Sequence, residues 1–207
     1  MTKIKNDNIE RMKNGRIYNP GDEEIAKTQF QCLDKLYEYN NTKPSDLQKR
    51  EELLKEMLGA MGKNCYIEQP FRANWGGKHL FLGDNVYVNS NLTAVDDGNI
   101  YVGDNVMFGP NVIIATASHP IEPNLRKKGY QFNLDVHIKN NVWIGAGVII
   151  VPGVTIGENT VIGAGSVVTK DIEANVVAVG NPCKVLRKIS EKDKLYYHKD
   201  KLIDIEI

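Results

Sequence analysis

The sequence predicts a mainly β protein built as a parallel β-helix, in which short strands wind around one axis in stacked coils. A β-branched aliphatic residue recurs at every sixth position through consecutive units, at Ile138, Ile144, Ile150, Ile156, Ile162 and Val168. Neither an α-helix nor an ordinary strand repeats every six residues, whereas one strand plus one corner of a solenoid does. Gly, Asn and Asp, which accept corner conformations cheaply, fill many intervening positions. Three units make one triangular coil with its aliphatic side chains inside.

The same phase extends upstream to Val102, Phe108 and Ile114, and an earlier block that starts at Leu82 is offset by two residues. An amphipathic sandwich with coincidental spacing is the alternative, but it does not account for so many consecutive matches in phase. We therefore expect the solenoid to occupy residues 61–185.

Residues 1–60 differ from the hexapeptide region in composition and pattern, because they are rich in charged residues and carry leucines at helical spacing. One expected helix opens at Gly21-Asp22 and reaches about Tyr39. Ser45 is the expected N-cap of a second helix, which Gly59 ends. The sequence therefore predicts an N-terminal helical segment ahead of the solenoid.

One interval, at about residues 120–135, has two prolines, several basic residues and no aliphatic ladder. It nevertheless fits a whole number of sixes between Ile114 and Ile138. We expect a loop extruded from the solenoid that returns as a short strand near Val136. Loops of this length are usually functional or disordered, and we interpret this one as functional. A charged tail over residues 186–207 completes the predicted organisation.

Composition excludes several classes of partner. The chain has 207 residues and a formal net charge of zero, which favours neither nucleic acid nor an anionic membrane. It contains no 18-residue apolar run, and its N-terminus lacks an apolar signal core, so we predict a cytoplasmic protein. The three cysteines are an odd number without metal-ligand spacing, which is typical of reduced thiols.

His119 stands out among the four histidines because it directly precedes the expected loop. An imidazole at that edge can act as a base at neutral pH, and an ordinary hydrogen-bonded corner histidine is the alternative. His137 lies 18 residues further on, one coil away in an unbroken solenoid, which raises the possibility of a metal site. Zinc would need a third nitrogen or thiolate ligand, so we predict no metal.

Two further clusters carry candidate chemistry. Asp96 and Asp97 can cap backbone amides at a corner or accept hydrogen bonds from a polyhydroxylated ligand. The basic residues Lys170, Lys184 and Arg187 follow the last coils. They are either solvated or placed to receive the phosphates of a nucleotide-bearing cofactor.

With the hexapeptide units and the histidine before the loop, five segments make the chain resemble the maltose and galactoside O-acetyltransferases, which are hexapeptide-repeat acyltransferases. The segments are Val95-Asp-Asp, Ser118-His-Pro, Asn141-Val-Trp-Ile-Gly, Pro152-Gly-Val-Thr-Ile-Gly and Asn181-Pro-Cys-Lys-Val. The resemblance implies a left-handed parallel β-helix and a homotrimer with active sites between subunits. It also implies transfer of an acetyl group from acetyl-CoA to a hydroxyl of a maltose-, glucose- or galactoside-like sugar.

The resemblance also implies roles for individual residues. His119 matches the catalytic base, and Asn89, Asp97 and Tyr87 match the acceptor site. The implied acetyl-CoA contacts are Trp143, Ala146, Ala164, Thr169, Lys170, Lys184 and Arg187. The chain departs from the galactoside branch at three of the matched positions. Pro20 replaces a sugar-binding Asp, Ala146 replaces a Ser and Lys184 replaces an Arg, so the sugar preference stays open.

Three functions are alternatives to sugar O-acetylation. The first is a hexapeptide-repeat acetyltransferase acting on another hydroxyl acceptor such as an antibiotic, and Val95-Asp-Asp with the helical N-terminus favours the sugar branch over it. The second is a metal-dependent hydratase on the same scaffold, which needs three histidines per site. The third is a non-catalytic binding solenoid, which would repeat one residue type in ranks, and no such array occurs.

Overall fold

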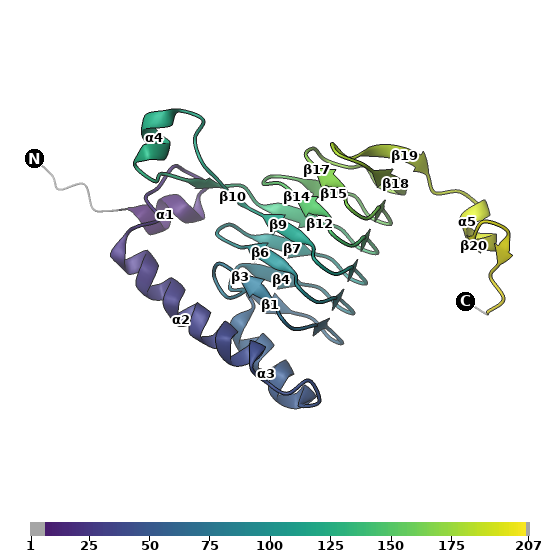
Figure 1. Cartoon of the computed structure of the whole chain (residues 1–207), viewed down its shortest axis with the longest axis horizontal. Helices are drawn as coiled ribbons and strands as arrows, with labels where there is room; N and C mark the ends of the chain where they lie inside the picture. Colours follow the sequence, from purple (N-terminus) through teal and green to yellow (C-terminus); the bar gives the residue numbers. More distant parts are fainter. Residues whose placement is uncertain (1–6, 206–207) are drawn as a thin grey trace, which may run out of the picture.

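The computed structural model describes residues 7–205 and consists of N-terminal helices, a β-solenoid and a C-terminal arm (Figure 1). The first six and last two residues, which belong to the predicted segments 1–60 and 186–207, lie outside the described residues. Successive coils stack into the solenoid, and the helices lie along one side of it (Figure 1).

Three parallel sheets form the faces of the solenoid, here called faces I, II and III. Face I contains β1 (Ala60–Met61), β4 (Leu80–Leu82), β7 (Ile100–Val102), β12 (Val136–Ile138) and β15 (Thr155–Ile156). Face II contains β2 (Tyr66–Ile67), β5 (Tyr87–Val88), β8 (Met107–Phe108), β13 (Trp143–Ile144), β16 (Val161–Ile162) and β18 (Val176–Val179), with β19 (Lys184–Lys188) antiparallel at its end. Face III contains β3 (Arg72–Ala73), β6 (Thr93–Val95), β9 (Ile113–Ala115), β14 (Ile149–Ile150) and β17 (Val167–Val168).

The hexapeptide prediction is confirmed. The predicted ladder from Ile138 to Val168 is fully buried, with the members of each face in register between coils. Backbone hydrogen bonds run from each coil to the next, as from the Gly145 N–H to the Ile162 carbonyl at 2.8 Å. Each coil therefore supplies both the apolar packing and the backbone partners that its neighbour needs.

The corner between faces I and II is built from asparagines, as expected for a corner that needs positive φ. Six of them have φ between 56° and 62°, namely Asn64, Asn85, Asn105, Asn141, Asn159 and Asn175. The side-chain amide of each of the first five donates to the amide oxygen of the asparagine in the following coil, over 2.8–3.1 Å. Asparagine tolerates this conformation better than other side-chain-bearing residues, and the ladder satisfies its amides as well.

Variation in coil length is concentrated at a single edge, between faces III and I, here called the variable edge. Steps from face I to II and from face II to III always take six residues. The step from Ala94 to Val102 takes eight, which explains the two-residue offset in the sequence. The step from Ile114 to Ile138 takes 24 because the extruded loop leaves the solenoid there.

The extruded loop is confirmed, and it carries more structure than the sequence analysis expected. It leaves along β10 (Ala117–Ser118) and returns along β11 (Phe132–Asn133), which pair antiparallel. Between them lies the short helix α4 (Pro123–Lys127), which was not expected. Glu122 caps this helix by accepting from the Leu125 N–H at 2.8 Å, and proline suits its first turn.

The N-terminal helices are α1 (Asn8–Lys13), α2 (Glu23–Asn40) and α3 (Leu47–Met57). Asp22 caps α2, which agrees with the expected opening of this helix at Gly21-Asp22. The expected cap of α3 was wrong by one residue, because the Asp46 carboxylate, rather than Ser45, accepts from the Lys49 N–H at 3.2 Å.

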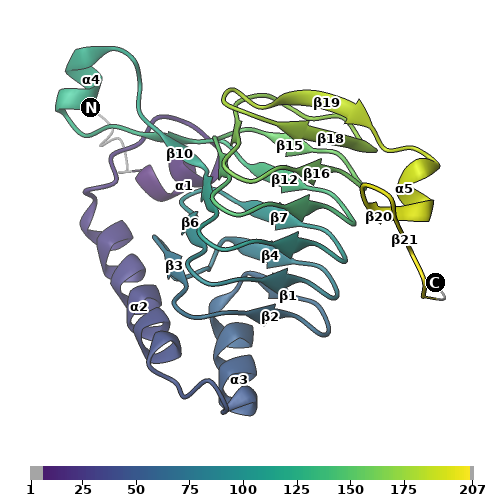
Figure 2. The same ribbon diagram turned by 45° about the vertical axis from the view of Figure 1, so that its right-hand side comes forward.

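The chain after β19 forms an arm that extends away from the solenoid (Figure 2). It contains α5 (Lys192–Leu195), β20 (Tyr196–His198) and β21 (Lys201–Leu202). Within residues 7–205, none of the helices combines the length and apolar character needed to cross a membrane. Cys32, Cys65 and Cys183 are all free thiols.

A buried arginine joins the helices to the first coil. Arg50 is 2% exposed, and its guanidinium donates to the hydroxyls of Tyr39 and Tyr66 at 3.2 and 2.7 Å. It also donates to the carbonyls of Ile67 and Pro44, at 2.8 and 3.2 Å. The guanidinium thus satisfies the buried oxygens of Tyr39 and Ile67 as well as the less buried oxygens of Tyr66 and Pro44.

We predict that Arg50→Met lowers the free energy of unfolding by about 2–3 kcal/mol, because several buried oxygens lose their donor. Urea denaturation measures this change. Lys49→Met on the same helix is the control, since its pair with Glu38 is exposed and should contribute little to stability. Equal stability of the two variants would show that the Arg50 contacts do not hold the helices on the coil.

Candidate active site

Polar residues from several coils and from the extruded loop lie together at the variable edge. Its cleft has a volume of about 550 Å³ and lies between α1, the edge itself and the returning strand β11. The lining residues are Met12, Lys13, Asn14, Gly15, His79, Asp97, Gly98, Asn99, Asn133, Leu134 and Asp135. Because insertions at one edge stack above one another, residues far apart in sequence share this cleft.

Asp96 fixes the backbone at this edge. Its buried carboxylate accepts from the amides of Trp75 and Gly77, at 2.7 and 3.0 Å. Desolvation raises the pKa of this carboxyl above its ordinary value, against the opposing effect of the backbone donors. The capping interpretation of Asp96 is therefore confirmed.

Asp97 faces a network of side-chain donors. Its carboxylate accepts from the Asn74 amide at 2.9 Å and from the Gln131 amide at 3.2 Å. The Asn133 amide donates to the Asp97 backbone carbonyl at 2.9 Å. The network fixes the carboxylate at the cleft wall, where it can accept hydrogen bonds from a polyhydroxylated ligand.

Tyr18 anchors the extruded loop. Its backbone exchanges two hydrogen bonds with Gln131, at 2.9 and 3.1 Å, and its hydroxyl accepts from the Gln131 side chain. The hydroxyl also donates to the Asn133 side-chain oxygen at 3.4 Å. Burial raises the pKa of Tyr18 to about 12, so the phenol stays protonated and can donate at neutral pH.

His119 follows β10 at the base of the loop and is exposed. Its Nδ1 lies 2.8 Å from the Tyr130 backbone oxygen. A carbonyl oxygen only accepts, so Nδ1 must carry the proton and, in the neutral ring, Nε2 holds a lone pair. The loop backbone thus selects the tautomer that a general base requires.

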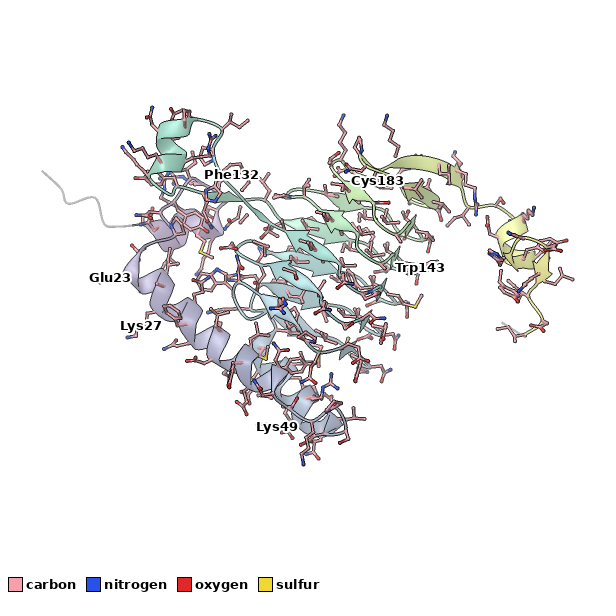
Figure 3. All side chains as sticks on the ribbon, in the orientation of Figure 1. Glu23, Lys27, Lys49, Phe132, Trp143 and Cys183 are labelled. Atoms are coloured by element: carbon pink, nitrogen blue, oxygen red, sulfur yellow. The ribbon has the colours of Figure 1, made fainter. Side chains whose placement is uncertain are left out.

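The other predicted site residues form a second group away from this cleft. Asn89, Ala146 and Ala164 lie at the edge between faces II and III. Ala146 and Ala164 are on successive coils, where the Gly165 N–H donates to the Ala146 carbonyl at 2.8 Å, and the coil of β8 separates them from Asn89. Tyr87 and Trp143 lie on face II and are 38% and 52% exposed. Figure 3 shows Trp143 on the side of the solenoid opposite Phe132 of the loop.

The residues predicted to contact the phosphates of acetyl-CoA lie towards the C-terminal end of the solenoid. Thr169 and Lys170 are exposed at the variable edge after β17. Lys184 and Arg187 are exposed on β19. Arg187 already makes a bidentate ion pair with Asp193, at 2.7 and 2.8 Å.

His119 and His137 do not stack on successive coils, because the predicted loop breaks the solenoid between them. The loop removes the intervening residues from the solenoid, so His137 stacks on the Tyr101 ring with the ring centroids 4.9 Å apart. Within residues 7–205, no three His, Cys, Asp or Glu side chains are placed to hold a metal ion together.

Several residues of the cleft were not identified from the sequence. Tyr18, Gln131 and Asn133 join segments more than 110 residues apart, and His79 is out of phase with the hexapeptide ladder. Only the long interval between Ile114 and Ile138 signalled that residues of this kind would meet there.

The comparisons with known proteins agree with this architecture. Residues 11–62 match a family model described as the maltose acetyltransferase hexapeptide capping motif. Residues 135–170 match a model described as bacterial transferase hexapeptide (six repeats). The chain is 50% identical over 200 residues to a galactoside O-acetyltransferase of Lactococcus lactis subsp. lactis (strain IL1403), and the match covers 97% of each chain.

Two solved structures are similar over most of their length. A galactoside acetyltransferase in complex with coenzyme A has a TM-score of 0.92 and 44% identity, and the match covers 96% of this chain and 98% of that one. A maltose O-acetyltransferase from Clostridium difficile 630 has a TM-score of 0.86 and 46% identity, with 88% of this chain and 97% of that one covered.

We predict that Tyr18→Phe speeds amide hydrogen exchange across residues 117–135 by about tenfold, because two buried side-chain amides lose the phenol oxygen. Exchange followed by mass spectrometry measures this. Tyr37→Phe is the control, since Tyr37 is exposed on α2. Equal exchange in the two variants would mean that the phenol does not anchor the loop.

Proposed function

Because this chain belongs to the maltose and galactoside O-acetyltransferase family, and is therefore an O-acetyltransferase that uses acetyl-CoA, we propose that it acetylates a hydroxyl of a sugar. The observation that carries the proposal is the cleft in which Asp97 and its amide network lie near the base of the loop that holds His119. Fixed carboxylate and amide groups are suited to hydroxyl recognition, and Asn89 and Tyr87 complete the proposed acceptor contacts.

The proposed base is His119. Its Nε2 takes the proton from the sugar hydroxyl, whose oxygen attacks the thioester carbonyl carbon of acetyl-CoA and forms a C–O bond. The tetrahedral intermediate collapses as the C–S bond breaks, and the leaving thiolate takes the proton back from His119. The bond from Nδ1 to the Tyr130 carbonyl supports this role because it also stabilises the imidazolium form.

A backbone amide is the proposed donor to the oxyanion. The Gly145 N–H is already bonded to the Ile162 carbonyl at 2.8 Å. Among the described residues the Ala146 N–H has no such backbone partner, which makes it the better donor. This choice also explains why alanine can stand where the galactoside branch has serine.

Acetyl-CoA is proposed to lie along the second group of residues, with Trp143 and Ala164 lining its path. Thr169, Lys170 and Lys184 then supply hydrogen bonds and positive charge for its phosphates. Arg187 can join them when it releases Asp193, since both acceptors compete for the same guanidinium fork.

The separation of the two groups supports a site shared between subunits. His119 and Asp97 lie at the variable edge, whereas Asn89, Ala146 and Ala164 lie at another edge of the same solenoid. One transfer needs the base, the acceptor and the thioester within a few ångströms of each other. We therefore propose a homotrimer in which the edge of one copy meets the second group of the next.

We predict that His119→Asn reduces sugar-dependent release of CoA by about 10²–10⁴-fold, because asparagine can still donate to the Tyr130 carbonyl but supplies no base. Thiol release with glucose, maltose, galactosides and chloramphenicol measures this and ranks the acceptors. Titration calorimetry with acetyl-CoA and thermal melting should match wild type.

His137→Asn is the matched control, since His137 stacks on Tyr101 outside the proposed site. Turnover of His119→Asn close to that of His137→Asn would refute the base. Release with chloramphenicol alone would move the acceptor from sugars to another hydroxyl compound.

A complementation experiment tests the shared site. We predict that His119→Ala and Ala146→Trp chains, each inactive alone, regain activity when mixed during refolding. In a closed ring of three, about one quarter of the interfaces would then combine two intact halves. Absence of recovery in mixed trimers, verified by native mass spectrometry, would place the whole site within one chain.

A further inference from the structure

His79 lines the cleft, and the proposed steps of acetyl transfer do not use it. It lies in the turn before β4, where the chain takes nine residues from Ala73 to Leu82. The corresponding step in the next coil, from Ala94 to Val102, takes eight. The extra residue widens this turn at the variable edge, which places the imidazole at the cleft wall.

The Asp96 backbone fixes the tautomer of this histidine. The Asp96 carbonyl oxygen lies 2.6 Å from His79 Nδ1. A carbonyl oxygen only accepts, so Nδ1 donates the proton and, in the neutral ring, Nε2 carries a lone pair. Within residues 7–205 Nε2 makes no hydrogen bond, and it is not closed off from solvent as the Trp75 Nε1 is. The fold thus leaves an acceptor atom open beside the cleft.

Three contacts hold the imidazole in place. The Ile100 N–H donates to the His79 backbone carbonyl at 2.8 Å, which ties the turn to the next coil. The Trp75 ring lies against the imidazole, with the ring centroids 5.3 Å apart. Asp96, which holds Nδ1, is itself fixed, because its buried carboxylate accepts from the Trp75 and Gly77 amides. A group held in this way loses little conformational freedom when a ligand binds.

The open lone pair distinguishes His79 from the carboxylates of the cleft. Asp97 and Asp135 also line it, and each carboxylate already accepts from neighbouring amides. A sugar carries several hydroxyls, and each of them can donate one hydrogen bond. When one hydroxyl faces His119 for transfer, the others still need acceptors. The Nε2 atom of His79 is suited to one of them.

We propose that His79 Nε2 accepts a hydrogen bond from a hydroxyl of the sugar acceptor other than the one that is acetylated, and so contributes to the choice of sugar. The inference rests on the proposed function, because it takes the cleft as the acceptor site. His79 contacts a hydroxyl that does not react. Its removal therefore weakens binding of the acceptor and leaves the proton transfer at His119 intact.

His79→Asn isolates the proposed contact. The asparagine amide can still donate to the Asp96 carbonyl, whereas no atom takes the place of Nε2. This variant should raise the KM for the sugar by about fivefold, as expected for loss of one neutral hydrogen bond. The KM for acetyl-CoA should not change, and kcat should stay within about twofold of wild type. His137→Asn is the matched control, because His137 stacks on Tyr101 outside the cleft.

Sugars that lack a single hydroxyl identify the one that His79 contacts. CoA release is measured with glucose, galactose and each of their monodeoxy analogues, for wild type and both variants. With one analogue, His79→Asn and wild type should have the same KM, because the partner hydroxyl is already missing. With the other analogues that are acetylated, the difference in KM should persist. A structural effect of the substitution would instead shift the KM of every analogue alike.

The outcomes separate this inference from the proposed function. A KM of His79→Asn equal to that of His137→Asn for every sugar, or a shift of the same size with every analogue, would overturn the contact while the sugar acetyltransferase stands. Absence of sugar-dependent CoA release from wild type would instead overturn the sugar acceptor and, with it, the role assigned to His79.

Discussion

The structure depends on one constraint, which is that every coil must satisfy the backbone of its neighbours. A strand of two or three residues has no stability alone, and its N–H and carbonyl groups are paired only when the next coil lies in register. Two edges therefore keep the six-residue spacing throughout, and the asparagine ladder holds one of them. Extra residues fit only where they leave the stack, and all of them leave at the third edge.

The site is a consequence of that restriction. Insertions of different length at the same edge of successive coils place the turn before β4, the Asp96-Asp97 corner and the extruded loop above one another. None of these segments forms a cleft alone. The N-terminal helices close the side of the edge, and Tyr18 ties them to the loop through Gln131. The N-terminal segment therefore forms part of the cleft wall, through Met12 to Gly15.

Most of the fold was predictable from the sequence because its signals are local. A buried aliphatic every six residues and corner residues between them follow from packing within one coil, and the caps of α2 and α3 were located to within one residue. The interval around residues 120–135 indicated the loop. It did not indicate α4, because the only local signal for this helix is the short capping pattern of Glu122 and Pro123. The Tyr18–Gln131 contact was not predictable from the sequence, because no local pattern distinguishes two polar residues that meet only after folding.

The position of His119 shows why a solenoid needs the loop for chemistry. On a regular face, backbone carbonyls such as that of Ile162 already accept from the next coil, so they are not available to select a histidine tautomer. The loop supplies a free carbonyl at Tyr130, and its own position depends on the buried phenol of Tyr18. The tautomer of the proposed base therefore rests on a contact from the N-terminal segment. Any change that releases this anchor should impair the base before it disturbs the three faces, because the hydrogen bonds between their strands run from coil to coil.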